Sequence, residues 1–378
     1  MNAPKLATIT PHIGDGGDWV IIKNATRGLV RLGYDITLAS SNLQAPDLDG
    51  IRYARVPLTR SSRNLQQAIA QMRAFDPDTH LLHAHSPIAL TYALALQKLR
   101  CRQAKVLMTY HWQTPDSSQL YRYKRWLFHQ ADRIHCYSLD ISDNLQTRYG
   151  VRRDRLHLAY VGVDETKFYP GTAAERERYR HQFGFTDTDL ALCFVGRLNP
   201  EKQIDTILRF LDARRDCTRD VKLAIAGSGP CHGELESLTE ELHLGDRVTF
   251  LGRIANPRHL YVASDALLLP STSMETFGLV VVEAALCGTP TLRSNTPGAR
   301  DQITPGQTGF VFDFNLPDDF GRAMLELLDS RDRLADMGAR AREYALEHFQ
   351  LDATIQAWHD MYRALLDDPA ASPYPSSL

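Results

Sequence analysis

The regular alternation of short apolar runs with helical patterns constrains the fold more than any other feature of this chain. Apolar runs rich in β-branched residues predict strands at 5–10, 34–40, 80–85, 105–110, 133–138, 155–161, 190–196, 222–227, 247–252, 266–271, 289–294 and 309–314. Helical patterns lie between them, for example at 18–32, 64–75, 87–99 and 118–131. This alternation predicts right-handed βαβ units and parallel sheets. Continuously apolar runs such as "LALCFV" predict sheets that helices cover on both faces.

The length of the chain predicts two domains. A chain of 378 residues is too long for one ordinary hydrophobic core. A stretch that contains Gly and Pro and then becomes rich in charge, around 162–182, predicts the boundary. We expect an α/β protein of two Rossmann-like, doubly wound domains that face a cleft, where such folds bind ligands. The expected segments are a first domain at 1–165, a second at 166–350, an amphipathic helix at 351–366 and a disordered tail at 367–378.

Composition excludes several classes of protein. A formal net charge of -2 argues against a nucleic-acid-binding protein, which usually carries a basic excess. The sequence has no apolar stretch near the roughly 18 residues of a membrane span, and its start lacks the apolar segment of a signal peptide. The cysteines form no C-x-x-C pair, so we interpret them as reduced thiols. We therefore expect a soluble, cytoplasmic protein, with contact with a membrane surface left open.

The first loop, "TITPHIGDGGDWV", follows a predicted strand and opens a helix. The dinucleotide fingerprint G-x-G-x-x-G fails here, because Trp19 stands where its last glycine should be. Gly16 and Gly17 still allow backbone amides to approach an anion at the start of the helix. A plain tight turn is the alternative.

Histidines mark the ends of two predicted strands. His83 and His85 alternate with Ala84 and therefore point to the same side of their strand, but a metal pair would lack a third ligand at suitable spacing. His111 follows the run at 105–110, where a neutral imidazole can bind a sugar hydroxyl or stabilise positive charge. A packed core histidine is the alternative.

The stretch "FVGRLNPEKQID" follows the first strand of the second half. Arg197 leaves the end of that strand, and Lys202 lies near the start of the next helix. Two cations beside a helix N-terminus suit a diphosphate. Alone this signal is weak, as is the glycine-rich turn "IAGSGP" around Gly227.

The run "STSMETFGLVVVEAALCGTP" contains two acids in an otherwise apolar segment. Glu275 and Glu283 are separated by a rotation of about 80° on a helix, so both can address one bound molecule. The amides of Phe277, Gly278 and Leu279 would be orphan donors that attract a phosphate, and each carboxylate could accept hydrogen bonds from a vicinal diol. Diol, diphosphate and diol together describe a nucleotide-sugar. Ion pairs of both acids with arginines are the alternative.

These motifs, in their order along the chain, resemble the retaining glycosyltransferases of the two-domain GT-B type, in particular family 4. The resemblance rests on "GDGGDW", "TYHWQTP", "ADRIHCYS", "GVDETKF", "FVGRLNPEKQID", "LAIAGSGP", "RVTFLGRI", "ALLLPSTSMETFGLVVVEAALCGTP" and "ITPGQTGFVF". The pair of acids with F-G-L between them is the specific part. One departure is Val161, which stands where the family often has Asn before G-V-D.

The resemblance implies a donor site in the second domain. Arg197 and Lys202 would bind the donor diphosphate and stabilise the leaving group, Glu275 would hold hydroxyls of the donor sugar, and Glu283 would bind the ribose. Arg253 and Ile254 would contact the base, and the remaining implied donor contacts are Gly227 and the backbone of Phe277, Gly278 and Leu279.

In the first domain, the resemblance implies that Gly16 and Gly17 approach the diphosphate and that His111 contacts the transferring sugar near its 6-hydroxyl. Asp15, Asp18 and His85 are candidates for binding the acceptor. The helix at 351–366 would cross back onto this domain. Catalysis would then depend on His111, Arg197, Lys202 and Glu275, and the family usually needs no metal or other cofactor for the chemistry.

The expected reaction moves a sugar from a nucleoside diphosphate to an acceptor hydroxyl with retention of configuration. The partners implied are a nucleotide-sugar donor and a glycan or lipid-linked acceptor, in the bacterial synthesis of polysaccharide, lipopolysaccharide or another glycoconjugate. The basic segment "YRYKRWLFHQADR" at 121–133 fits contact with an anionic membrane, or equally a docked surface helix. Alternatives are a nucleotide-sugar 2-epimerase, a phosphorylase, transfer to a small soluble acceptor, and a catalytically inactive donor-binding protein.

Overall fold

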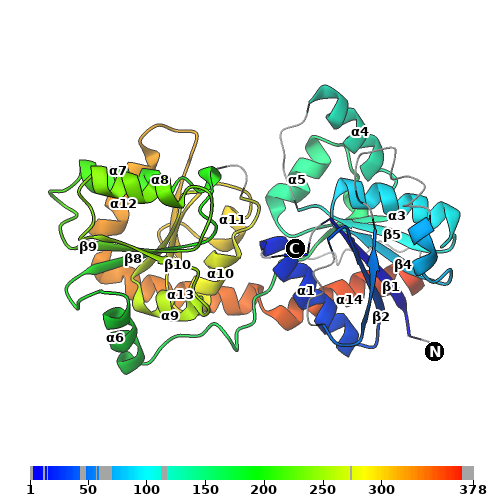
Figure 1. The fold of residues 1–378 in the computed structure, drawn as a ribbon, viewed down its shortest axis with the longest axis horizontal. Helices are drawn as coiled ribbons and strands as arrows, with labels where there is room; N and C mark the ends of the chain where they lie inside the picture. Colours follow the sequence, from blue (N-terminus) through cyan, green and yellow to red (C-terminus); the bar gives the residue numbers. More distant parts are fainter. Residues whose placement is uncertain are drawn as a thin grey trace. The chain divides into compact units, whose positions relative to one another are not determined.

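The chain forms two compact units in a computed structural model (Figure 1). The structure describes residues 3–11, 13–14, 16–42, 48–56, 58, 70–111, 117–272 and 275–367. The first unit comprises residues 1–161 and 351–378, and the second comprises residues 162–350. The proposed disordered tail at 367–378 lies outside the described residues except for Asp367. None of the helices in these ranges is long and apolar enough to cross a membrane.

The first unit is built on a seven-stranded parallel sheet with the order β3-β2-β1-β4-β5-β6-β7. Its strands are β1 (Lys5–Thr10), β2 (Asp35–Ser40), β3 (Ile51–Arg55), β4 (Leu81–Ala84), β5 (Lys105–Thr109), β6 (Arg133–Cys136) and β7 (Leu156–Leu158). Its α-helices are α1 (Gly17–Arg31), α3 (Pro87–Leu99), α4 (Ser118–Phe128), α5 (Leu139–Thr147) and α14 (Leu351–Asp367), with short 3-10 turns at Met72–Ala74 and Arg153–Arg155.

Strand β3 is a correction to the sequence analysis, which assigned no strand to the loop region after 34–40. Ile51–Arg55 is an edge strand in which only Ala54 is buried, so it lacks the continuous apolar run of the inner strands. The helix expected at 64–75 falls largely outside the described residues.

The second unit is built on a six-stranded parallel sheet with the order β10-β9-β8-β11-β12-β13. Its strands are β8 (Leu190–Val195), β9 (Val221–Ala226), β10 (Val248–Gly252), β11 (Ala266–Leu269), β12 (Thr291–Ser294) and β13 (Gly309–Phe312). Its α-helices are α6 (Ala173–Gln182), α7 (Ile204–Ala213), α8 (His232–Glu241), α9 (Pro257–Ala263), α10 (Leu279–Leu286), α11 (Ala299–Gln302), α12 (Asp319–Asp329) and α13 (Leu334–His348), with 3-10 turns at Pro200–Lys202 and Arg331–Arg333.

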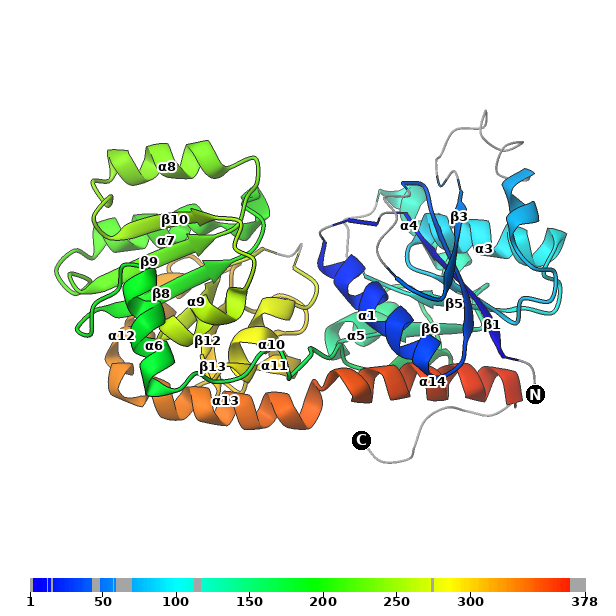
Figure 2. The same cartoon turned by 60° about the horizontal axis from the view of Figure 1, so that its bottom comes forward.

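Alternate residues of the inner strands fill two different cores. Leu190, Leu192 and Phe194 of β8 pack in one cluster with α7 and α12, whereas Ala191 and Cys193 pack in another with α6, α9 and α10. Larger side chains therefore face one layer of helices and smaller ones face the other, and Figure 2 shows helices on both sides of this sheet. This is the covered, continuously apolar strand that the sequence predicted.

Helix α14 closes the core of the first unit. A side chain on Gly28 of α1 would meet Ile355 of α14 at 2.4 Å, so the glycine allows the two helices to approach closely. Figure 2 shows α14 lying beside α1. Trp358 and Tyr362 of α14 are 2% and 0% exposed, and both contact buried histidines of the sheet.

Candidate functional site

In the second unit, the strand order reverses between β8 and β11. Ligands of open parallel sheets bind beyond the carboxyl ends of the strands at such a switch point. Arg197 and Lys202 follow β8, and Glu275 follows β11. The fold therefore brings these predicted residues to neighbouring loops. Gly227 and Arg253 follow β9 and β10, the next strands along the same sheet.

Lys202 and Glu275 form a direct ion pair. The Nζ atom of Lys202 donates a hydrogen bond to Oε2 of Glu275 at 2.5 Å, and the side chains are 18% and 13% exposed. Burial alone would raise the pKa of Glu275, but the charge and hydrogen bond of Lys202 outweigh it, with help from Arg293 and the Phe277 amide. The pKa of this carboxyl consequently lies below its ordinary value, and the group is ionised at neutral pH.

The turn before α10 differs in one respect from the prediction. The Phe277 amide hydrogen-bonds the Glu275 carboxylate, as does the Thr276 amide at 3.2 Å, so the expectation that Phe277 offers an orphan donor is wrong. Gly278 is the N-cap of α10 with a φ of 80°, a conformation that favours glycine. The amides of Gly278 and Leu279 stand at the start of the helix.

Arg293 holds this turn from behind, and the sequence analysis missed it. Its guanidinium is fully buried on β12 and donates to the carbonyl of Phe277 at 2.8 Å. It also donates to Oγ1 of Thr296 at 2.8 Å and to Oε1 of Gln302. An arginine inside the predicted strand "TPTLRS" is the signal that could have identified it, because buried arginines are rare unless they are paired.

Glu283 lies on α10 and accepts a hydrogen bond from the buried hydroxyl of Tyr261 at 2.8 Å. Burial raises the pKa of Glu283 to about 7, although the hydrogen bond from Tyr261 acts in the opposite direction. The alternative in which both acids form arginine ion pairs is therefore wrong: Glu275 pairs with a lysine and Glu283 with a tyrosine. A buried carboxyl with a pKa raised to near neutrality is typical of functional sites.

Gly227 has a packing role. A Cβ on this residue would lie 1.7 Å from the carbonyl oxygen of Gly196, and its amide donates to the carbonyl of Gly252 at 2.7 Å. Only glycine lets the loops after β8 and β9 lie this close together. Arg197 and Arg253 are exposed, whereas Ile254 packs partly against the core formed with α6 and α9.

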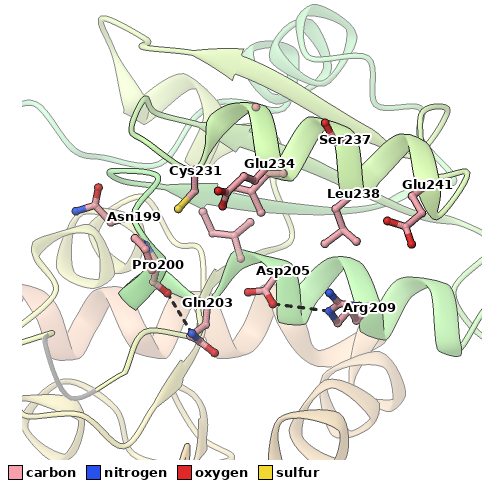
Figure 3. A pocket seen from close by; sticks show the side chains of 13 residues that line it. Asn199, Pro200, Gln203, Asp205, Arg209, Cys231, Glu234, Ser237, Leu238 and Glu241 are labelled. Atoms are coloured by element: carbon pink, nitrogen blue, oxygen red, sulfur yellow. Dashed lines mark hydrogen bonds and ion pairs between the residues drawn. The ribbon is translucent and has the colours of Figure 1, made fainter.

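A groove of about 700 Å³ separates α7 from α8 in the second unit (Figure 3). Its lining includes the acids Asp205, Glu234 and Glu241, and Nε of Arg209 lies 3.8 Å from a carboxylate oxygen of Asp205. This acidic lining disfavours a diphosphate. The predicted donor residues lie outside the lining that the described residues form.

In the first unit, the strand order reverses between β1 and β4. Gly16 is the N-cap of α1 after β1, and Gly17 is the first residue of that helix. Asp18 accepts a hydrogen bond from the Trp19 amide at 2.9 Å. Asp15 lies outside the described residues.

His85 follows β4 and His111 follows β5, and both side chains are only 3% exposed. Nδ1 of His85 lies 3.0 Å from Nε2 of His111. His83 instead bonds Tyr362 and Thr109, so the two histidines that the sequence placed on one side of a strand have different partners. No group of three or more metal-binding side chains is assembled within the described ranges.

Burial dominates the electrostatics of these histidines. It lowers the pKa of His111 to about 4, and the charge of Asp18 partly opposes this shift. It also lowers the pKa of His83 to about 3 and the pKa values of His85 and His135 well below the ordinary value. All four imidazoles are therefore neutral at pH 7.

Two family profiles match adjoining parts of the chain. The profile described as Glycosyltransferase Family 4 matches residues 16–167, and the one described as Glycosyl transferases group 1 matches residues 175–344. Together they include nearly all the predicted site residues, from Gly16 to Glu283.

Curated proteins and a solved structure are also similar. A D-inositol 3-phosphate glycosyltransferase of Rhodococcus opacus (strain B4) is 32% identical over 243 residues, which are 62% of this chain and 53% of that protein. N-acetyl-alpha-D-glucosaminyl L-malate synthase of Bacillus anthracis is 26% identical over 297 residues, which are 76% and 75% of the two chains. The chain thus spans about half the length of the first relative.

The crystal structure of Anabaena HepE in complex with UDP and glucose matches with a TM-score of 0.82 and 20% identity, over 96% of this chain and 100% of that one. This likeness confirms the predicted GT-B fold of two Rossmann-like sheets.

Proposed function

We propose, from the premise that this chain belongs to the group 1, family 4 glycosyltransferases, that it moves a sugar from a nucleoside-diphosphate sugar to an acceptor hydroxyl with retention of configuration. The observation that carries the proposal is the cluster of Arg197, Lys202 and Glu275 on the two loops at the switch point of the second sheet. In this proposal the second unit binds the donor, and the first unit binds the acceptor.

The leaving nucleoside diphosphate needs positive charge as the glycosidic bond breaks. Arg197 and Lys202 supply two cations, and the amides of Gly278 and Leu279 at the start of α10 supply oriented dipoles. These groups neutralise the departing phosphate without a metal ion. Gly16 and Gly17 at the start of α1 are proposed as further diphosphate contacts.

The carboxylates are proposed to hold the two diols of the donor. Glu275 is kept ionised by Lys202, so it accepts hydrogen bonds from hydroxyls of the sugar. Glu283 accepts from Tyr261 with one oxygen, Oε2, and its other oxygen serves the ribose. Arg253 and Ile254 would contact the base.

Retention follows from substitution on one face of the sugar. A double displacement requires a carboxylate nucleophile beneath the anomeric carbon. Glu275 is engaged by Lys202 and by two backbone amides, which makes it a poor nucleophile. We therefore favour front-face attack, in which the acceptor oxygen bonds to the anomeric carbon while the departing phosphate oxygen takes the acceptor's proton.

A UDP-sugar is the donor proposed for first testing, because the HepE structures were solved with UDP, with UDP and glucose, and with UDP-glucose. The acceptor is proposed to be lipid-linked or part of a glycan, in a bacterial polysaccharide, lipopolysaccharide or glycoconjugate. Asp18 and His85 of the first unit are the described candidates for contacting it.

Helix α4 supports a lipid-linked acceptor. Tyr123 and Trp126 are 40% and 57% exposed, and Arg122 and Arg125 beside them are also exposed. Aromatic rings beside arginines are suited to an anionic lipid surface. A cytoplasmic enzyme that touches the inner face of the membrane would present this helix.

Thermal-shift measurements with UDP-, GDP-, ADP- and TDP-sugars test the donor, because a bound ligand raises the melting temperature by mass action. The donor that stabilises the protein should then be consumed only when an acceptor is added. Conversion of the donor without an acceptor would indicate epimerisation and contradict the proposal. The proposal would also be contradicted if none of the nucleotide-sugars raised the melting temperature.

A further inference from the structure

A continuous chain of hydrogen bonds in the first unit determines which ring nitrogen carries the proton in His135 and in His83. Nε2 of His135 lies 3.0 Å from the carbonyl of Ala159, which can only accept, so Nε2 carries the proton. Nδ1 of the neutral ring then accepts from Thr109 Oγ1 at 3.0 Å. Thr109 in turn accepts from Nε2 of His83 at 2.7 Å, and Nδ1 of His83 accepts from the Tyr362 hydroxyl at 2.6 Å. Both ring nitrogens of His83 and of His135 therefore have a hydrogen-bond partner.

The neighbouring pair, His85 and His111, is different. Its inner nitrogens, Nδ1 of His85 and Nε2 of His111, bond each other at 3.0 Å. Its outer nitrogens, Nε2 of His85 and Nδ1 of His111, are buried and have no hydrogen-bond partner among the residues that the structure describes. Both side chains are 97% buried, so unpaired ring nitrogens are costly here. Two such atoms at the ends of β4 and β5, beside the switch point, indicate a ligand.

The pair must offer one donor and one acceptor. Each neutral imidazole has a single N–H, and the inner hydrogen bond uses one of the two. If His85 donates to His111, then Nδ1–H of His111 is an outer donor and Nε2 of His85 is an outer acceptor. A sugar hydroxyl, which both donates and accepts, complements such a pair.

Asp18 selects between the two proton arrangements. Burial lowers the pKa of His111, and the Asp18 carboxylate partly opposes this shift. The pKa of His85 is lowered first by burial and then by the neighbouring rings of His83, His111 and His135. The charge of Asp18 therefore acts more strongly at the His111 end of the pair than at the His85 end. Its negative charge favours a proton on the outer Nδ1 of His111.

We propose that His85 is a positioning residue that donates to His111 through their 3.0 Å contact and fixes it as the Nδ1–H tautomer, so that the outer nitrogens of the pair bind hydroxyls of a sugar. This inference rests on the proposed function, which has His111 contacting the transferring sugar. It adds the reason for the orientation of His111 and assigns a role to His85.

The tautomer can be measured without substrate by long-range ¹H–¹⁵N NMR of histidine-labelled protein at pH 7.5. We expect His111 as the Nδ1–H form in the wild type. His85→Phe removes the inner donor and should release His111 toward the Nε2–H form. His85→Asn places an amide N–H near the former Nδ1 and should restore the Nδ1–H form.

Turnover should follow the tautomer. His85→Phe should lower kcat by about tenfold with a smaller change in the KM for the donor, the loss expected for one hydrogen bond. His85→Asn should restore most of the wild-type kcat. The matched control is Thr109→Val, which breaks the continuous chain of hydrogen bonds and should lower stability while the His111 spectrum and kcat stay as in the wild type.

An Nε2–H form of His111 in the wild type, or a His85→Phe protein with an unchanged His111 tautomer, would overturn the proposal. A changed tautomer with unchanged kcat would also overturn it. Failure of the proposed function would appear differently, as a wild-type protein that transfers no sugar from any donor, and the NMR result does not depend on that outcome.

Discussion

Nζ of Lys202 lies 2.5 Å from Oε2 of Glu275, so the cation assigned to the phosphates and the acid assigned to the sugar neutralise each other directly. The charge and hydrogen bond of Lys202 hold the pKa of the Glu275 carboxyl below its ordinary value. We expect the two positions to be coupled in their effect on stability. Each side chain is at least 82% buried, so removing either partner leaves the other as an unpaired buried charge.

Lys202→Ala should destabilise the second unit by about 1–3 kcal/mol, because the Glu275 carboxylate loses its partner. Adding Glu275→Gln to this variant should recover part of the loss, since the remaining amide carries no charge. Urea unfolding of the single and double variants measures the coupling. Additive losses would show that the pair is energetically independent.

Arg197→Ala separates catalysis from stability. Arg197 is exposed, so its removal should leave the urea midpoint unchanged, while turnover falls by about 10²–10³ through lost stabilisation of the leaving phosphate. Arg209→Ala, an exposed arginine in the groove between α7 and α8, is the matched control and should retain activity. Near-normal turnover of Arg197→Ala would refute the diphosphate assignment.

Donor affinity should depend on pH through Glu283. With a pKa of about 7, this carboxyl becomes protonated as the pH falls below neutrality and then accepts the ribose hydroxyls less well. Calorimetric titration with a nucleoside diphosphate should show weaker binding at pH 6 than at pH 8. Tyr261→Phe should move this dependence to higher pH, because the hydrogen bond from Tyr261 lowers the pKa of Glu283. Glu283→Gln should abolish the dependence, and an unaltered pH profile in that variant would contradict the assignment.

The first unit should lose stability in mild acid. The pKa values of His83 and His111 are lowered by burial to about 3 and about 4, whereas unfolded histidines protonate near pH 6.5. The unfolded state therefore binds more protons, and stability present above pH 6.5 is lost as the pH falls toward these folded-state values. Between pH 6.5 and 5 each buried histidine costs on the order of 2 kcal/mol.

Hydrogen exchange at pH 7.5 and at pH 5, corrected for the intrinsic rate, tests this expectation. Protection of β4 and β5 should fall more than that of β8 and β9, whose unit has its histidines on helices and loops. Equal losses in both sheets would contradict it.

The sequence predicted the inner strands well because buried parallel strands are continuous apolar runs, as in β8. It failed at Ile51–Arg55, where an edge strand carries a mixed pattern. Family membership was also predictable, since the resemblance drawn from the motifs is confirmed by the two matching profiles.

Side-chain partners were the part that the sequence could not predict. The contact between Lys202 and Glu275 joins residues on different loops, and nothing in local spacing reveals it. The same holds for the hydrogen-bond partners of Arg293 and for the inner contact of His85 with His111. Gly227 was predicted as a donor contact, and the sequence did not reveal that this glycine is also required for loop packing.

A crystal structure with the stabilising nucleotide-sugar or its nucleoside diphosphate bound tests the central claim most directly. We predict phosphate oxygens within hydrogen-bond distance of Arg197, Lys202 and the amides at the start of α10. We also predict that the Glu283 carboxylate accepts hydrogen bonds from the ribose hydroxyls. Phosphates bound in the groove between α7 and α8, or anywhere remote from these groups, would contradict it.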